Sequence, residues 1–104
     1  MKWSTKIADL LKDLPQNVAI GPTAEKDLAR VLKKNFREFE QIFKDLIRLG
    51  SGTLPPAGRK KLKIFDAWQM DAGRYRVVFR PQADGFFILA VFSKPEQKKR
   101  FHSL

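Results

Sequence analysis

The first hydrophobic pattern along the chain is that of a short amphipathic helix. Apolar residues recur at helical spacing from Trp3 to Leu14, while lysine and aspartate side chains fall off this stripe. Ser4 can cap the start of the helix, and Pro15 ends it. Because a helix of about ten residues is not stable alone in water, we expect it to dock, either on its own domain or on a partner.

A short apolar run and a long helical stripe come next. Residues 17–20 predict a short strand. Apolar residues then recur at helical spacing from 24 to 47, and Gly50 is suited to end the stripe. The stripe predicts either one long helix or two helices broken near Asn35. We favour the two-helix hairpin because it is more compact.

The pattern changes to that of strands after a Gly- and Pro-rich loop at 51–58 and a basic run at 59–63. Runs with strand character occupy residues 65–71, 74–80 and 86–92. The last run is continuously apolar, which indicates a strand covered on both faces. The basic run allows two interpretations, a solvated linker or an edge that contacts phosphate.

Helices followed by strands are typical of an α+β fold, in which helices cover one face of the sheet. We therefore expect a helical hairpin packed on one face of a small antiparallel sheet, with the amphipathic helix at 1–15 as an addition. The length of 104 residues suits a single domain, 1–104.

The run at 74–80 has two different faces. Side chains of a strand alternate, so Tyr75, Val77 and Phe79 share a face that suits a core. The other face carries the arginines of this run, which are Arg74, Arg76 and Arg80. We expect them on the side of the sheet that the helices leave open. They can form a solvated surface, but arginine without any lysine favours phosphate recognition.

Charge strengthens this interpretation. Twenty-one Lys and Arg residues against eleven Asp and Glu residues give a formal charge of +10 at pH 7. Such a balance favours polyanionic partners, which include nucleic acid or ribosome, an acidic protein, and an anionic membrane surface.

Several classes of protein are disfavoured by the composition. The chain has no cysteine, which excludes a disulfide framework, a thiolate zinc site and a cysteine nucleophile, and is compatible with a reducing cytosol. No apolar run approaches a membrane span, and the first residues lack the pattern of a signal peptide. We expect a cytoplasmic protein without a cofactor.

The second half of the chain resembles the RelE/ParE superfamily of bacterial toxins from toxin–antitoxin pairs. The pattern of that family is a basic leucine-containing run, a strand, a Gly-x-Tyr-Arg turn and strand, a hairpin, and an apolar strand ending in Lys-x-Glu. The matching stretches are residues 61–63, 73–79 and 88–98. The resemblance covers 17–101, which implies a RelE/ParE-like toxin domain with 1–15 as a helical extension.

The resemblance implies one of two activities. RelE-like members cut mRNA in the ribosomal A site, whereas ParE-like members poison DNA gyrase and cleave no RNA. An antitoxin that wraps the toxin neutralises both kinds. We expect ribosome-dependent mRNA cleavage, with a cognate antitoxin, the ribosome and mRNA as partners. The alternatives are a ParE-like poison of gyrase and a basic RNA-binding module without catalysis.

Cleavage of RNA by its own 2′-hydroxyl needs a base, cations at the phosphate and an acid for the leaving oxygen, and it needs no metal. The resemblance assigns the phosphate contact to Arg76 and a second basic position to Lys94. The family's lysines on the preceding strand correspond to Ala67 and Gln69, which cannot take up a proton. His102 titrates near neutral pH and can transfer a proton, but it can equally be a solvent-exposed residue without a role.

The remaining basic residues near these positions are expected to bind RNA. Phe101, which aligns with the tyrosine acid of the family, is expected to stack on a base. The full set of expected RNA contacts is Arg74, Arg80, Lys98, Lys99, Arg100, Phe101, Lys61 and Lys63.

Overall fold

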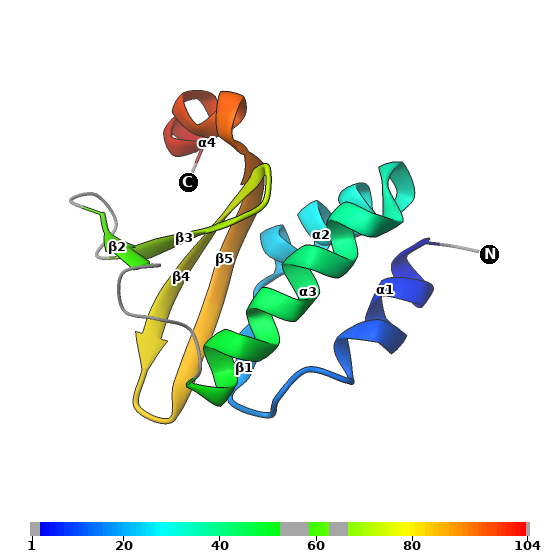
Figure 1. Cartoon of the computed structure of the whole chain (residues 1–104). Coiled ribbons are helices and arrows are strands. Elements are labelled where there is room, and N and C mark those ends of the chain that lie inside the picture. Colours follow the sequence, from blue (N-terminus) through cyan, green and yellow to red (C-terminus); the bar gives the residue numbers. More distant parts are fainter. Residues whose placement is uncertain (1–2, 53–58, 63–66, 104) are drawn as a thin grey trace.

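A computed structural model describes residues 3–52, 59–62 and 67–103 of the chain (Figure 1). The helices are α1 (Trp3–Leu11), α2 (Pro22–Lys34), α3 (Phe36–Ser51), the 3-10 turn η2 (Lys94–Glu96) and α4 (Gln97–Ser103). The strands are β1 (Val18–Ile20), β2 (Arg59–Lys61), β3 (Trp68–Ala72), β4 (Tyr75–Gln82) and β5 (Gly85–Ser93).

The five strands form one sheet in the order β1-β5-β4-β3-β2. Helices α1, α2 and α3 lie on one side of this sheet, and α4 lies at one end of it (Figure 1). The predicted α+β class and helical hairpin are confirmed. The sheet itself differs from the prediction, because β1 adds a parallel edge next to β5 and residues 59–61 of the basic run form the antiparallel edge strand β2.

Asn35 separates the two helices of the hairpin. Its backbone is extended, with φ −158° and ψ 105°, so the helix cannot continue through it. Its side-chain oxygen accepts hydrogen bonds from the N–H groups of Arg37 at 3.0 Å and Glu38 at 3.2 Å. Asn35 therefore ends α2 and caps α3, which confirms the predicted break.

Gly50 does not end α3, contrary to the sequence-based expectation. The helix continues to Ser51 and is capped by Gly52, which has a φ of +78° and donates its N–H to carbonyls of the last turn. A Cβ atom on Gly50 would lie 2.7 Å from Val18 and 2.9 Å from Asn17. Gly50 therefore serves the close approach of β1 to α3.

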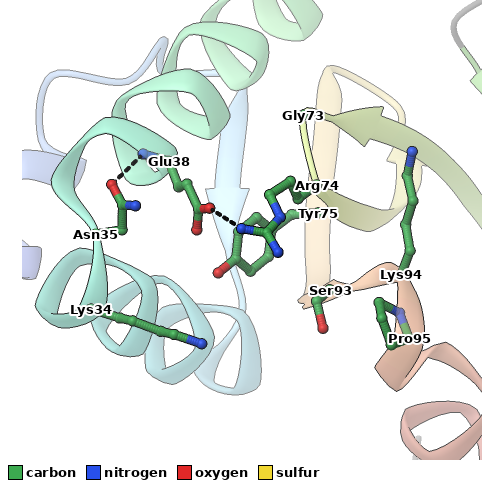
Figure 2. A pocket seen from close by; sticks show the side chains of 9 residues that line it. All are labelled: Lys34, Asn35, Glu38, Gly73, Arg74, Tyr75, Ser93, Lys94 and Pro95. Carbon is green, nitrogen blue, oxygen red and sulfur yellow. Dashed lines mark hydrogen bonds and ion pairs between the residues drawn. The ribbon is translucent and has the colours of Figure 1, made fainter.

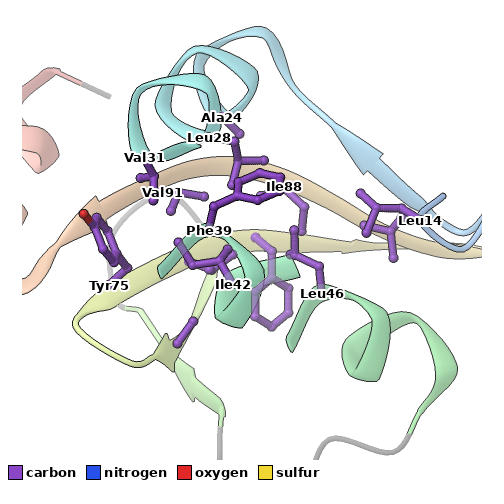
Figure 3. Close-up of a cluster of buried hydrophobic side chains, with 14 of the residues drawn as sticks. Leu14, Ala24, Leu28, Val31, Phe39, Ile42, Leu46, Tyr75, Ile88 and Val91 are labelled. Atoms are coloured by element: carbon purple, nitrogen blue, oxygen red, sulfur yellow. The ribbon is translucent and has the colours of Figure 1, made fainter. Parts of the chain in front are cut away.

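The main hydrophobic core lies between the helices and the sheet (Figure 3). It includes Tyr75, Val77 and Phe79, as the alternation predicts. It also includes Ile7 of α1 and Leu14, so the N-terminal helix docks on its own domain.

The opposite face of the sheet is not open throughout, as the sequence had led us to expect. It carries a small second cluster formed by Ala67, Val78, Ala90 and Phe92. The pairing of β4 with β5 skips Leu89, since Val78 lies opposite Ala90 and the next residue lies opposite Ile88. This bulge changes which residues of β5 face the main core. Apolar residues are therefore needed along the whole run at 86–92.

Among the described helices, none combines the length and the apolar character that crossing a bilayer requires.

Candidate nucleic-acid interface

A tight hairpin turn sets the positions of the predicted site. Ala72 pairs with Tyr75, which leaves Gly73 and Arg74 as a two-residue turn. Gly73 has a φ of +63°, as such turns require at a central position. The same register places Asp71 directly opposite Arg76.

Arg76, Asp71 and Lys94 form a cluster on the face of the sheet away from the helices. Arg76 Nε lies 3.3 Å from Asp71 Oδ1, and Lys94 Nζ lies 3.6 Å from Asp71 Oδ2. The Arg76 side chain is 28 % exposed and that of Asp71 is 56 % exposed. The structure thus brings together the two predicted cations, around a carboxylate that sequence reasoning missed. The two-residue turn was the signal that could have found Asp71, because it fixes the cross-strand partner of Arg76.

The end of β5 holds Lys94 in place. The Ser93 hydroxyl donates to Glu96 Oε1 at 2.6 Å, and the Ser93 N–H donates to the same oxygen at 3.3 Å. The bond from the Ser93 hydroxyl is the main reason that the pKa of Glu96 is lowered. This capping box turns the chain sharply after β5, and the first residue of the turn is Lys94.

Arg74 does not point to the same face as Arg76, contrary to the alternation argument. It is a turn residue rather than a strand residue, so the two-residue period does not apply to it. Its Nη1 lies 3.3 Å from Glu38 Oε1 on α3, and its side chain is 84 % exposed. Arg74 therefore belongs to the helical side of the hairpin.

A groove of about 540 Å³ opens at this end of the molecule (Figure 2). It lies between the junction of α2 with α3, the β3–β4 turn and the start of η2. Its lining residues are Lys34, Asn35, Glu38, Gly73, Arg74, Tyr75, Ser93, Lys94 and Pro95. Burial, together with hydrogen bonding to Glu38, raises the pKa of the Tyr75 hydroxyl.

Arg100 was expected to contact RNA but is bound within the protein. Its guanidinium donates to both carboxylate oxygens of Asp27, at 2.9 and 2.7 Å, and lies 5.4 Å from the centre of the Phe92 ring. Asp27 is 3 % exposed and Arg100 is 15 % exposed. The bonds to Asp27 are the main reason that the pKa of Arg100 is raised. Arg100 thus fastens α4 to α2.

The other predicted contacts are spread over the surface. Arg80 is exposed on β4, four residues from Arg76 and so roughly 13 Å along the strand. Lys61 is exposed on β2, and Lys98 and Lys99 are exposed on α4. Lys63 lies outside the described residues, as do the side chains of Phe101 and His102, so their roles stay predictions.

Within the part of the chain that the structure describes, no three carboxylate or imidazole side chains gather into a group that could hold a metal ion.

The sequence matches no family model and no curated protein. Solved structures do resemble the fold. The YoeB dimer from Staphylococcus aureus is 18 % identical with a TM-score of 0.60, and the match covers 71 % of this chain and 91 % of that one. The RelBE2 toxin–antitoxin complex from Mycobacterium tuberculosis is 21 % identical with a TM-score of 0.61, over 79 % and 94 % of the two chains. The chain therefore has the α+β fold of the RelE and YoeB toxins, as its Gly-x-Tyr-Arg pattern predicted.

Proposed function

We propose that the protein is the toxin of a toxin–antitoxin pair and that it cleaves ribosome-bound mRNA. The observation that carries this proposal is the cluster of Arg76, Lys94 and Asp71 on the exposed face of the sheet. The fold shared with toxins supports the first part. The RelBE2 neighbour, a complex of toxin and antitoxin, supports an antitoxin as a partner of this chain.

The cluster contains cations for the phosphate and a general base, which are the groups that a 2′-hydroxyl needs for its attack. Arg76 and Lys94 can exchange Asp71 for the scissile phosphate and stabilise the charge that develops on it. Asp71 then lies free between them to accept the 2′ proton as general base. This role cannot fall to Ala67 or Gln69, which are buried.

In the proposed reaction the 2′-oxygen forms a bond to phosphorus while the bond from phosphorus to the 5′-oxygen breaks. The 2′ proton passes to Asp71, and His102 in its protonated form gives a proton to the leaving 5′-oxygen. The products are a 2′,3′-cyclic phosphate and a 5′-hydroxyl. Lys98, Lys99 and Lys61 supply further contacts to the RNA backbone, and the ribosome as target implies action in the cytoplasm.

Cleavage of mRNA on programmed ribosomes, with mapping of the new ends, tests the proposal. We expect Arg76→Ala and Asp71→Asn each to slow cleavage by about a hundredfold or more. Arg76→Lys should restore only part of the rate, because lysine lacks the bidentate fork. Lys44→Ala, which removes an exposed charge on α3, is the matched control. Intact mRNA with wild-type protein on active ribosomes would remove the proposal.

The alternative is a ParE-like poison of gyrase, which the absence of the family's paired lysines favours. In that case the protein would trap complexes of gyrase with DNA while mRNA stays whole. A basic RNA-binding module would do neither and would leave growth unaffected on expression. The antitoxin of such a pair is expected in the reading frame next to that of the toxin. Growth inhibition that is relieved when this frame is co-expressed would separate a toxin from such a module.

A further inference from the structure

We propose that the groove beside the β3–β4 turn holds the RNA segment next to the scissile phosphate, with Lys34 and Arg74 as its phosphate contacts. This inference rests on the proposed function and extends it to a second part of the surface. Sequence reasoning did not single out Lys34, which ends α2.

The groove and the Arg76–Asp71–Lys94 cluster lie on the two sides of the β3–β4 hairpin, next to the same turn. Lys94 borders both, because the residue lines the groove while its side chain reaches the other face, where its Nζ lies 3.6 Å from Asp71 Oδ2. The N–H of Lys94 donates to the carbonyl of Arg74 at 3.2 Å, so the two walls are joined by a backbone hydrogen bond. An RNA strand whose phosphate is bound at Arg76 can therefore pass around the β3–β4 turn to reach the groove.

The groove is built for an anion. Lys34 and Arg74 bring their cationic groups to the groove, against the single carboxylate of Glu38, whereas the Lys94 side chain extends away from them (Figure 2) and its Nζ lies at Asp71. Glu38 lies 3.3 Å from one nitrogen of the Arg74 guanidinium. A guanidinium has five N–H donors, so it can bind a phosphate while this contact persists. Glu38 holds Arg74 in position at the cost of a negative charge in the groove.

The lining favours a nucleic-acid backbone over a peptide. Peptide recognition uses a free sheet edge or apolar pockets for alternate side chains. This groove lies at a hairpin turn, and its one aromatic residue, Tyr75, is only 8 % exposed. Lys34 and Arg74 are both exposed in it, which suits recognition of phosphates without recognition of bases.

Binding of a short 2′-O-methylated oligoribonucleotide, measured by fluorescence anisotropy over a range of salt, tests the inference. This probe cannot be cleaved, so binding is separated from catalysis. We expect Lys34→Ala and Arg74→Ala each to weaken binding roughly threefold to tenfold. Each should also reduce the slope of log affinity against log salt by about 0.7. Glu38→Gln should strengthen binding, because it removes the repulsive charge.

Lys33→Ala is the matched control, because Lys33 is an exposed neighbour on the same helix that does not line the groove. Unchanged binding in Lys34→Ala and Arg74→Ala, with a loss in Arg76→Ala, would overturn the groove and leave the proposed function intact. Unchanged binding in all three would count against both. Poly-glutamate that binds with the same dependence on Lys34 and Arg74, where the oligonucleotide does not, would make the groove a protein-docking surface and refute the RNA assignment.

Discussion

Single residues in this chain differ in how far the sequence reveals their role. Tyr75 and Arg76 were placed correctly by alternation, because both lie within a regular strand. Arg100 was not, although its charge and surroundings match those of Lys98 and Lys99. Its partner Asp27 falls on the apolar stripe of α2 and is 3 % exposed. A carboxylate on a buried stripe is a signal that an internal cation is needed.

Asp27 has a second task besides binding Arg100. It accepts the N–H of Val91 at 2.9 Å. Strand β1 pairs with β5 only at residues 86–88, so beyond that point Val91 has no strand partner on this side. The Asp27 carboxylate accepts the hydrogen bond that a neighbouring strand would otherwise accept. Loss of this carboxylate should therefore affect both α4 and the sheet.

Removal of the Arg100 guanidinium should destabilise the fold. Arg100→Ala leaves the buried Asp27 carboxylate with only the exposed Arg30 as a cation nearby, and we expect the free energy of unfolding to fall by about 3 kcal/mol. Urea unfolding followed by circular dichroism measures this. Arg30→Ala is the control, since Arg30 also faces Asp27 but is 67 % exposed, and should change stability by less than about 0.5 kcal/mol. Equal small effects of both variants would contradict the assigned role of Arg100.

At the scale of elements, local chemistry defines where strands turn and helices begin. The positive φ of Gly73 permits the two-residue turn, and Asn35 breaks one helical stripe into two helices. The capping box of Ser93 and Glu96 redirects the chain after β5. The turn, the helix break and the capping box each depend on atoms within a few residues of one another. Their positions could therefore be predicted from the sequence in principle.

The capping box should make the free energy of unfolding depend on pH in the acidic range. The pKa of Glu96 is lower in the folded protein than in the unfolded chain, chiefly through the bond from Ser93. Its stabilisation is therefore complete above the unfolded pKa of about 4.3, and it is lost as the pH falls through the folded value. We expect Glu96→Gln to be less stable than wild type by less than about 1 kcal/mol at neutral pH, because glutamine keeps an acceptor oxygen but loses the charge.

The difference between wild type and Glu96→Gln should shrink towards zero as the pH falls from about 5 to 3. Urea titrations at several pH values measure it. Glu40→Gln on α3 provides an exposed carboxylate for comparison. A difference that stays constant over this range would show that ionised Glu96 does not stabilise the turn.

At the scale of the whole molecule, α1 closes the main core. Ile7 is 1 % exposed and belongs to the same cluster as residues of α2, α3 and the sheet. A nine-residue helix has little stability of its own, so its order depends on this packing. Helix α1 therefore packs as part of the main core.

Truncation of Ile7 should weaken the entire fold. We expect Ile7→Ala to lower the free energy of unfolding by about 3 kcal/mol, through lost burial and the cavity left behind, with unfolding still a single transition. Lys12 directly follows α1 and has an exposed side chain. Lys12→Ala should therefore have little effect on the free energy of unfolding. An unchanged urea midpoint in Ile7→Ala would show that α1 does not stabilise the domain.

The sequence by itself determined the types of the main elements, the inward face of β4, the excess of positive charge and the similarity to the toxins. The first three follow from periodicity and composition, which involve only neighbouring residues, and the last comes from the resemblance of the Gly-x-Tyr-Arg pattern to that family. Tertiary structure alone decided which cations are available to a ligand. Arg100 is neutralised by a partner 73 residues away, whereas Lys34 and Arg74 meet at one groove and Arg76 and Lys94 meet at one carboxylate. Such charges meet only through packing, and packing depends on the whole chain.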